Sequence, residues 1–549
     1  MPSVRVKATK PRQGRYRTFS AATIGFFAAF LIIGLSVFRD YGISWDEFPT
    51  RQFGVMYVQN TVPDLSTLDS VRAVTGPAYE RFGPLVEIVL VHMEKLMGPT
   101  DIRTVFYMRH LVTFLTFFLG VVCFHRLCRR RFSSGLALLA CVCLVVSPQL
   151  FSHAFYNVKD ISFLTLFVAS ILALDTALTH QTWRTMLVHA VMTVVLLGVR
   201  VLGVFAMMLT GTAAIARRPT RRTLLLLAGY GVVVVVLLPF VWPVLQIDFV
   251  HIVTSAVLGT TSNPYLRSDL FRGQAISASA LPWDYVPTWI LITTPMIVSA
   301  LFVVGAARLV GELARRPKVF LCQERQLDVI VLCWFFMPVV GAAVLRPIMY
   351  DGWRHLFFVY PALVYVATAG METVAILVTA RVSEPRMQTA VGVLAAGLLL
   401  SLAPIVTFMV QNHPFEHIYF NRFAGRDMKE VKQRFELDYW GLSYRKSLEY
   451  IVRTDTASTI RLYVTNYPGR VNVAMLDPRD RARIAPVARP EDADYFVTNY
   501  RWHPEDYPFT PEVFSVRVGN ASINSVFASN RRREQQPGLV PPPAGVRPR

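Results

Sequence analysis

The segment Tyr41-Gly-Ile-Ser-Trp-Asp46-Glu47 follows the first long apolar run of the chain and carries two adjacent carboxylates. Residues 19–38, which precede it, contain no charged side chain and are long enough to cross the ~30 Å hydrocarbon core of a bilayer as a helix. The glycine and serine of the segment favour a turn, so the two carboxylates are expected on a loop at the membrane surface. Two interpretations stay open here: an ordinary solvated acidic loop, or carboxylates placed for chemistry.

The composition of the chain is that of a polytopic membrane protein. Of its 549 residues, 53% are hydrophobic, and the mean hydropathy of +0.40 is too high for a soluble protein of this length. The net charge is +20, yet the Lys and Arg residues gather between the apolar runs. They are therefore interpreted as determinants of topology and contacts for anionic membrane lipids rather than as a nucleic-acid surface.

The charges that flank the apolar runs predict the topology. Residues 1–18 are basic and contain no acid, which places this end of the chain in the cytoplasm. Residues 19–410 are predicted to form an α-helical transmembrane domain of about eleven spans. These spans are 19–38, 104–124, 135–150, 161–178, 185–199, 201–216, 223–245, 286–310, 327–345, 355–378 and 389–410.

Arg200 interrupts the apolar run 185–216, which could be one tilted helix or two short ones. Arg184 on one side and the basic residues from Arg217 onward on the other both look cytoplasmic. A single span cannot place both of its ends on the same side of the membrane. A hairpin with Arg200 at its external tip is therefore predicted.

An odd number of spans places the remainder of the chain outside. Residues 411–530 are predicted to form a small external α/β domain, because alternating stretches such as 513–518 indicate strands and 443–452 indicates a helix. The tail 531–549 is rich in Arg and Pro and is predicted to be disordered. Within the first external loop, 84–97 has the apolar spacing of a helix that lies in the interface. The external loops are 39–103, 151–160, 246–285 and 346–354.

The 151–160 loop concentrates polar side chains between two spans. It contains Tyr156, Asn157, Lys159 and Asp160. A connection this short keeps its acid and its base at the interface, where ionisable groups are costly and usually functional. A purely structural pair of Lys159 with Asp160 is the alternative.

The 346–354 loop is similar. Arg346, Arg354 and the following His355 lie beside aromatic residues, which alone would suit an interfacial belt. Arginine, however, presents a planar fork that matches phosphate. This loop is therefore a candidate anion site.

The predicted external face thus offers both carboxylates and cations. This combination suits a reaction in which a base takes a proton from an acceptor hydroxyl while a phosphate leaves. Nucleotide sugars are not supplied outside the cytoplasm, so a transferase at this face needs a donor carried by the membrane, and a polyprenyl-phosphate-linked sugar fits. The carboxylates are Asp46, Glu47, Glu80, Asp160 and Asp351, and the cations are Arg200, Arg267, Arg272, Arg346 and Arg354.

The order of these features resembles the GT-C glycosyltransferases, and in particular the group of the protein O-mannosyltransferases and the bacterial lipid A aminoarabinose transferase. The resemblance covers residues 20–380 and rests on the Asp46-Glu47 loop, Tyr79-Glu80-Arg-Phe-Gly-Pro84, the stretch ending in Lys159-Asp160, and Tyr350-Asp-Gly-Trp-Arg-His355. It implies inverting transfer of a sugar from a polyprenyl phosphate in a bacterial inner membrane. It also implies that the aspartate of the first loop is the base, and Asp46 is preferred over Glu47. Glu80 is followed by arginine where the aminoarabinose transferase has a lysine and two prolines, which leaves the acceptor open.

The predicted partners are a polyprenyl-phosphate-linked sugar, an acceptor that is a lipid, a glycan or a protein, and the membrane lipids; no nucleic acid is expected. The residues of the predicted site fall into three groups. The catalytic residues are Asp46, Glu47 and Asp160, the donor phosphate is bound by Arg200, Arg354, His355 and Lys159, and the acceptor side includes Glu80, Tyr156, Asn157 and Arg272.

No certain cofactor is predicted, although a divalent metal is left open. His413 and His417 are weak evidence for a metal site, and packing explains them better. Asp438 and Trp440 could hold a sugar acceptor or form a turn at which domains dock.

The main alternative function is that of a transporter or flippase for a lipid-linked sugar, which would also need many spans and interfacial charges. Transporters usually place ionisable groups near mid-membrane on broken helices, whereas the charges here collect at one face. A scaffold that only displays the C-terminal domain would leave these charges without a role.

Overall fold

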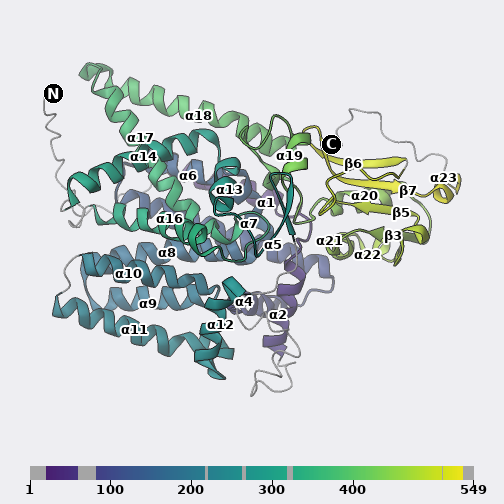
Figure 1. Cartoon of the computed structure of the whole chain (residues 1–549), viewed down its shortest axis with the longest axis horizontal. Coiled ribbons are helices and arrows are strands. Elements are labelled where there is room, and N and C mark those ends of the chain that lie inside the picture. Colours follow the sequence, from purple (N-terminus) through teal and green to yellow (C-terminus); the bar gives the residue numbers. More distant parts are fainter. Residues whose placement is uncertain are drawn as a thin grey trace.

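The computed structural model describes residues 20–59, 82–216, 220–262, 268–317, 325–509 and 511–535. It has two parts: a bundle of apolar helices, and a C-terminal domain built on a β-sheet, which lies at one end of the bundle (Figure 1). Glu80 and Arg267 fall outside the described residues, so the predictions that concern them are not tested.

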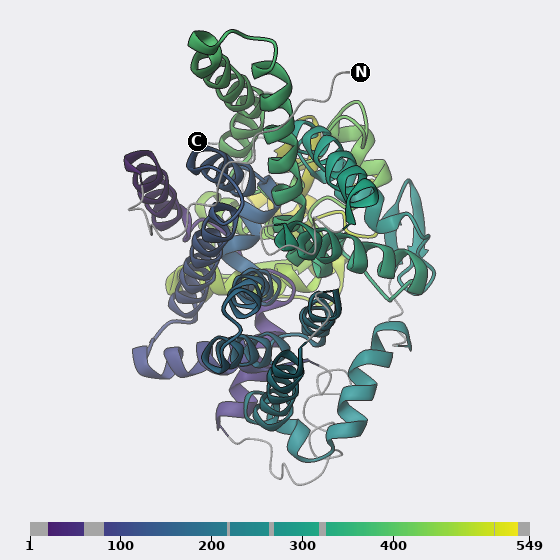
Figure 2. The same cartoon turned by 90° about the vertical axis from the view of Figure 1, so that its left-hand side faces the viewer.

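The bundle helices lie roughly side by side, as the view along them in Figure 2 shows. They are α1 (Ala21–Val37), α5 (Ile102–Arg129), α6 (Ser134–Val145), α8 (Val158–His180), α9 (Trp183–Leu197), α10 (Val204–Ala216), α11 (Arg221–Val241), α14 (Met296–Arg315), α16 (Gln326–Leu345), α17 (Tyr360–Thr379) and α18 (Met387–Asn412).

Seven helices among the described residues are long and apolar enough to cross a membrane. Several of them expose large apolar side chains, such as Leu225 of α11 at 65% and Leu400 of α18 at 73%. Such surfaces are stable against lipid rather than against water. The chain is therefore a polytopic α-helical membrane protein with a small C-terminal sheet domain, as predicted. The seven are α5, α8, α11, α14, α16, α17 and α18, the last two with the short 3-10 turns that precede them.

The predicted number of about eleven spans stays a prediction. α6 and the following α7 (Pro148–Tyr156) meet the criterion of length and hydropathy only as a pair, bent by 67°. α1, α9 and α10 are apolar but shorter than a full span.

Pro148 breaks the predicted span 135–150. α6 ends at Val145, and Pro148 starts α7, which runs through most of the segment 151–160. The segment 151–160, for which the sequence predicts a loop, is therefore mostly helical, because α8 begins at Val158, directly after α7. Proline fits the first turn of a new helix but cannot donate the backbone hydrogen bond that would continue the previous one.

The run 185–216 is divided at Arg200. This residue has an extended backbone, with φ −149° and ψ 140°, and is followed by a short 3-10 turn before α10 begins. Arg200 forms an ion pair with Asp160, in the first turn of α8. The break between α9 and α10 therefore lies beside the start of α8.

The helix predicted at 84–97 is present as α4 (Leu85–Met97), and its position in the membrane interface stays a prediction. Its acidic residues Glu87 and Glu94 are buried against Arg109 of α5, whose side chain is fully buried. A buried guanidinium needs such partners. The acidic face of α4 therefore turns inward, and apolar Leu96 is 88% exposed.

An ion-pair network joins helices at the end of the bundle away from the sheet domain. Arg131, just after α5, contacts Asp328 of α16 at 3.2 Å and Glu372 of α17 at 2.9 Å. Arg308 of α14 contacts the same Glu372 at 3.1 Å. This network fixes four helices to one another far from the candidate site.

The region between α11 and α14 contains strands that the sequence did not predict. After α12 (Phe249–Ser262), β1 (Ser268–Phe271) and β2 (Gln274–Ser277) form an antiparallel hairpin, which precedes α13. Phe271 also bridges to Phe435 near the C-terminal domain. The hairpin therefore connects the bundle to that domain. α13 spans Tyr285–Thr293.

The C-terminal domain is built on a five-stranded sheet in the order β4-β3-β5-β7-β6. β3 is parallel to β4 and β5, whereas β7 is antiparallel to β5 and β6. The helices are α19 (Met428–Arg434), α20 (Tyr444–Thr454), α21 (Tyr467–Val471), α22 (Pro478–Arg481) and α23 (Asn530–Gln535). The strands are β3 (Ile460–Val464), β4 (Ile484–Pro486), β5 (Tyr495–Thr498), β6 (Glu512–Val518) and β7 (Ala521–Ala528).

This domain confirms the predicted α/β class. The predicted helix 443–452 is α20, whose apolar face packs on the sheet through Leu448 and Ile451. The prediction of disorder from residue 531 is wrong at its start, because α23 continues to Gln535, and residues 536–549 lie outside the described residues.

Candidate active site

The two neighbouring carboxylates of the first loop have different surroundings. The side chain of Asp46 is 42% exposed, whereas Glu47, the first residue of α2 (Glu47–Gln59), is buried. Glu47 accepts a hydrogen bond from the backbone N–H of Ser44 at 2.7 Å, and its other oxygen lies 2.9 Å from Nε2 of His110. The Glu47 carboxylate therefore fixes the loop to α5, and Asp46 is the member of the pair that a substrate can reach.

The C-terminal domain holds this loop from the other side. The side-chain amide of Asn472 donates to the carbonyl of Ile43 at 2.8 Å and accepts from its N–H at 2.9 Å. The backbone N–H of Trp45 donates to the carbonyl of Trp440 at 3.1 Å. The backbone on the N-terminal side of Asp46 is therefore fixed by residues more than 390 positions away.

Arg354 is the centre of the polar cluster. Its Nη1 lies 2.7 Å from the Asp46 carboxylate and 3.6 Å from that of Asp160, and its Nη2 lies 3.2 Å from Asp351. The guanidinium also stacks over the ring of Trp440 at 4.6 Å and is almost fully buried. One arginine thus joins three carboxylates from three separate segments.

Asp160 lies at the first turn of α8, where Asn157 caps the helix. The Asn157 side chain donates to the Asp160 carboxylate at 2.8 Å and accepts from its backbone N–H at 3.2 Å. The same carboxylate forms the ion pair with Arg200. Asp160 is therefore positioned to hold Arg200 and Arg354 together.

Lys159 and His355 complete the basic side of the cluster. The Lys159 amine lies 3.5 Å from the centre of the Phe82 ring, and among the described residues it forms no ion pair. His355 packs against Tyr350 and lies within electrostatic range of Lys159, Arg200 and Arg354. The structure therefore brings together all four of the residues that the sequence predicts for binding of the donor phosphate.

Two guanidinium groups of this cluster have an unused donor. Nε of Arg200 and Nε of Arg354 are buried and have no hydrogen-bond partner among the described residues. Buried donors are normally satisfied, and an unsatisfied donor calls for an explanation. An anion bound at the cluster would supply acceptors for them.

Arg501 of the C-terminal domain supports the cluster, and the sequence did not predict it. Its Nη2 lies 2.5 Å from the Asp351 carboxylate, and its Nη1 donates to the carbonyl of Tyr439. Asp351 in turn holds Arg354. The sequence offered no local signal for this role, because Arg501 lies in a separate domain, 150 residues from its partner.

Tyr156 is placed beneath the cluster, not on its surface. It is 1% exposed and packs against Trp440 with ring centroids 5.6 Å apart. His153, also fully buried, accepts a hydrogen bond from the indole N–H of Trp440 at 3.2 Å. The prediction that Tyr156 contacts the acceptor is therefore wrong for this structure: the segment is helical and turns this ring into the core. Asn157 likewise supports Asp160 from a buried position.

Arg272 lies apart from the cluster. It occupies the turn of the β1–β2 hairpin, where its side chain is 49% exposed and contacts Asp284 at 2.7 Å and Thr288 at 2.8 Å. Both partners are local, so the prediction that Arg272 takes part in the site is not supported by its position.

The histidines that follow α18 contact acidic side chains. His413 contacts Glu416 at 2.6 Å and Asp40 at 2.9 Å, and His417 lies 3.3 Å from Asp438. Burial opposes the charged form of His413, but its hydrogen bonds to Asp40 and Glu416 raise its pKa to about 9. Among the described residues, no group of three or more His, Cys, Asp or Glu side chains is arranged to hold a metal ion.

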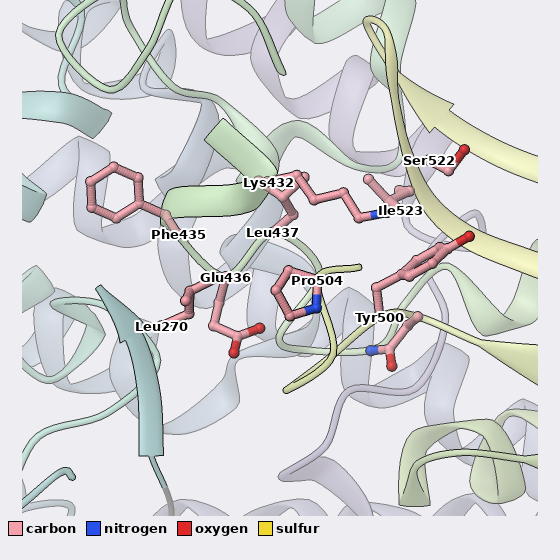
Figure 3. Close-up of a pocket in the computed structure, with 10 residues that line it drawn as sticks. Leu270, Lys432, Phe435, Glu436, Leu437, Tyr500, Pro504, Ser522 and Ile523 are labelled. Carbon is pink, nitrogen blue, oxygen red and sulfur yellow. The ribbon is translucent and has the colours of Figure 1, made fainter. Parts of the chain in front are cut away.

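A pocket lies where the β1–β2 hairpin meets the C-terminal domain (Figure 3). Leu270, Lys432, Glu436 and Tyr500 are among its lining residues, and the Lys432 amine extends over the Tyr500 ring at 3.3 Å. Burial raises the pKa of Glu436 to about 8, so this carboxyl is mostly protonated at neutral pH. Burial and the nearby Asp351 raise the pKa of Asp269 to about 6.

The arrangement as a whole combines a reachable carboxylate with a group of cations. Asp46 could accept a proton from a hydroxyl group brought to the site. Arg200, Arg354 and Lys159 could bind a phosphate and stabilise the charge that develops on it.

No protein-family model and no curated protein sequence matches the chain. Several solved structures, however, are similar to it. The ArnT protein of Cupriavidus metallidurans bound to undecaprenyl phosphate is 12% identical, with a TM-score of 0.49 over 95% of this chain and 100% of that one. The oligosaccharyltransferase of Archaeoglobus fulgidus is 10% identical, with a TM-score of 0.47 over 86% of this chain and 65% of that one. The arabinofuranosyltransferase AftD from Mycobacteria is 12% identical, with a TM-score of 0.42 over 92% of this chain and 41% of that one.

At these identities and scores the comparisons assign no role to any residue. The three proteins are only structures to which this chain is similar.

Proposed function

We propose that this protein is an integral-membrane glycosyltransferase that moves a sugar from a polyprenyl-phosphate-linked donor to an acceptor by inverting transfer. The observation that carries the proposal is the 2.7 Å contact between the exposed Asp46 carboxylate and Arg354, next to Lys159, Arg200 and His355. Transfer from a lipid phosphate needs a base and an anion-binding group side by side. A transporter needs no such pair.

In this proposal the basic cluster binds the phosphate of the donor. Arg354 and Arg200 present their unused Nε donors together with the Lys159 amine, and His355 adds a further polar contact. Guanidinium groups bind phosphate bidentately, which fixes its position as well as its charge. Asp160 and Asp351 hold the two arginines in place by ion pairs.

Asp46 acts as the general base. The acceptor oxygen forms a bond to the anomeric carbon while the bond between that carbon and the phosphate oxygen breaks. The bonding electrons leave with the polyprenyl phosphate, and the hydroxyl proton passes to Asp46. Attack from the face opposite the phosphate inverts the configuration of the anomeric carbon.

Asp46 and the donor phosphate share Arg354. The phosphate competes with Asp46 for the guanidinium, so binding of the donor weakens the ion pair that holds the carboxylate. A carboxylate released in this way is a better proton acceptor. Donor binding therefore prepares the base.

The experiment is a transfer assay on the purified protein in proteoliposomes. Undecaprenyl phosphate carrying arabinose, 4-aminoarabinose or mannose is supplied with extracts of bacterial cell envelope as acceptors, and release of undecaprenyl phosphate is followed by mass spectrometry. We expect release by the wild-type protein, and release slower by ~10² or more with Asp46→Asn. Movement of an intact lipid-linked sugar between leaflets without release would instead identify a flippase.

The orientation is part of the proposal: N-terminus in the cytoplasm, and site and C-terminal domain outside, in a bacterial inner membrane. A cysteine-free protein with Arg489→Cys, an exposed position in the C-terminal domain, should react with an impermeant reagent in intact cells. Trp183→Cys, exposed at the start of α9, should react only after the cells are opened. The reverse pattern would refute the orientation.

A further inference from the structure

An aromatic cluster lies beside Asp46, and the proposed transfer step does not use it. Trp45 precedes Asp46 in the chain, while Tyr467 and Trp502 come from the C-terminal domain. The ring centroid of Trp45 is 5.7 Å from that of Trp502 and 6.1 Å from that of Tyr467. Trp502 is 39% exposed, and the other two rings are partly exposed.

Arg501 fixes the geometry of the two indole rings. Its guanidinium lies over Trp45 at 4.9 Å and over Trp502 at 4.8 Å. Because the same guanidinium is held by Asp351, the aromatic cluster and the Arg354 cluster are parts of one connected assembly.

The loop that presents Trp502 has an unusual backbone. Tyr500 has φ 61° and Trp502 has φ 62°, in the left-handed region that bulky residues rarely adopt. The indole N–H of Trp502 donates to the carbonyl of Ser268 at 3.0 Å, which anchors the ring on the β1–β2 hairpin. Strained residues kept in place by their surroundings are typical of binding and catalytic sites.

We propose that Trp45, Tyr467 and Trp502 form an acceptor subsite that binds a sugar ring of a glycan. This inference rests on the proposed function and specifies its acceptor. The face of an aromatic ring carries negative charge density and packs well against the polarised C–H groups of a pyranose or furanose. A sugar stacked on Trp45 would place a hydroxyl group near Asp46, the next residue in the chain.

The polar groups of the cluster favour a glycan over a lipid chain. The Arg501 guanidinium lies against both indole rings and is paired with Asp351. An acyl chain would need a continuous apolar groove, whereas a sugar needs aromatic faces with hydrogen-bonding groups beside them. A peptide or a lipid acceptor is an outcome of the test that would contradict the proposal.

The test measures glycan binding by the full-length protein in nanodiscs. The probe is a glycan array that carries hexose, pentose and amino-sugar oligosaccharides. We expect the wild-type protein to bind a subset of these glycans, and Trp502→Ala and Trp45→Ala to bind them roughly tenfold more weakly or worse. Trp502→Phe keeps an aromatic face and should retain most of the binding. Trp183→Ala, which removes an indole on α9 that is 64% exposed, is the control and should bind as the wild type does.

Binding of undecaprenyl phosphate to each variant separates this inference from the proposed function. The Trp502 variants should still bind undecaprenyl phosphate, and this binding also shows that they are folded. Wild-type protein that binds undecaprenyl phosphate but no glycan, or alanine variants that bind glycans normally, would overturn the subsite. Wild-type protein that does not bind undecaprenyl phosphate would instead contradict the proposed function.

Discussion

Arg354 and Asp46 are separated by 308 residues in the sequence, and their side chains lie 2.7 Å apart. The contact joins the loop between α1 and α2 to the turn that leads into α17, and Asp160 brings the start of α8 to the same point. Three segments that hydropathy places at the end of different helices thus meet in one cluster. The predictions below test what each member contributes.

Asp46→Asn should abolish most of the transfer activity while leaving the fold intact. Asparagine has nearly the shape of aspartate but cannot accept the proton, so the transfer rate should fall by ~10² or more. Binding of undecaprenyl phosphate should be retained. The measurement is the initial transfer rate beside lipid binding. Asp284→Asn, an acid that pairs with Arg272 apart from the cluster, is the control.

Glu47→Gln should lower the stability of the fold more than the rate of sugar transfer. The Glu47 carboxylate is buried against His110 and the N–H of Ser44, and loss of a charged hydrogen-bonding partner costs roughly 1.5 to 3 kcal/mol. The midpoint of thermal unfolding should fall, while the rate per folded molecule stays near that of the wild type. A stable but inactive Glu47→Gln protein beside an active Asp46→Asn protein would identify Glu47 as the base.

Arg354→Gln should weaken binding of the donor phosphate. Loss of a charge-assisted hydrogen bond is expected to cost roughly 1.5 to 3 kcal/mol of binding free energy. Titration with undecaprenyl phosphate, followed by microscale thermophoresis, measures the change. Arg346→Gln, an exposed arginine eight positions earlier, removes the same charge from the same segment and should have little effect. Equal affinity in both variants would remove Arg354 from the phosphate site.

Arg501 and Asp351 should behave as a coupled pair. Removal of one partner from a buried ion pair leaves the other uncompensated and costs roughly 3 to 5 kcal/mol. Arg501→Gln and Asp351→Asn should each lower the stability, and the double variant should lose less than the sum of the two. Thermal unfolding of all four proteins gives the coupling energy, and strictly additive effects would mean that the contact is not formed in solution.

Glu436 should make stability depend on pH. Burial raises its pKa to about 8, so the folded protein keeps a proton that the unfolded chain releases at a lower pH. The free energy of unfolding should therefore fall as the pH rises from about 5 to about 8. Glu436→Gln cannot ionise and should flatten this dependence, as measured by intrinsic fluorescence during thermal unfolding. Glu491→Gln, which is 64% exposed, should keep the wild-type slope.

Hydropathy predicted most of the bundle because the thickness of a bilayer fixes the length of a helix that crosses it. It failed at Pro148 and Pro295, which divide the predicted spans 135–150 and 286–310. A proline among apolar residues hardly changes an average hydropathy, yet it removes a backbone donor and ends the helix. The short strands of the β1–β2 hairpin also escaped prediction, because their pairing depends on contacts with distant parts of the chain.

The candidate site could be predicted where the sequence carries charge at the end of an apolar run. Asp46, Asp160, Arg200 and Arg354 all have this signal. Arg501 does not, because it lies in a domain with many arginines and its partner is remote. Tyr156 is a residue for which the sequence signal was misleading. Its position beside charged residues suggested contact with a ligand, but the helix turns its side chain into the core.

The contact of Arg501 with Asp351 also sets an order of events in the life of the molecule. Every proposed ligand of the donor phosphate has been synthesised once the chain has reached residue 355, yet Asp351, which holds Arg354, acquires its own partner only when residue 501 has emerged and its domain has folded. A copy without the folded C-terminal domain would therefore lack the contact that holds Asp351 beside Arg354.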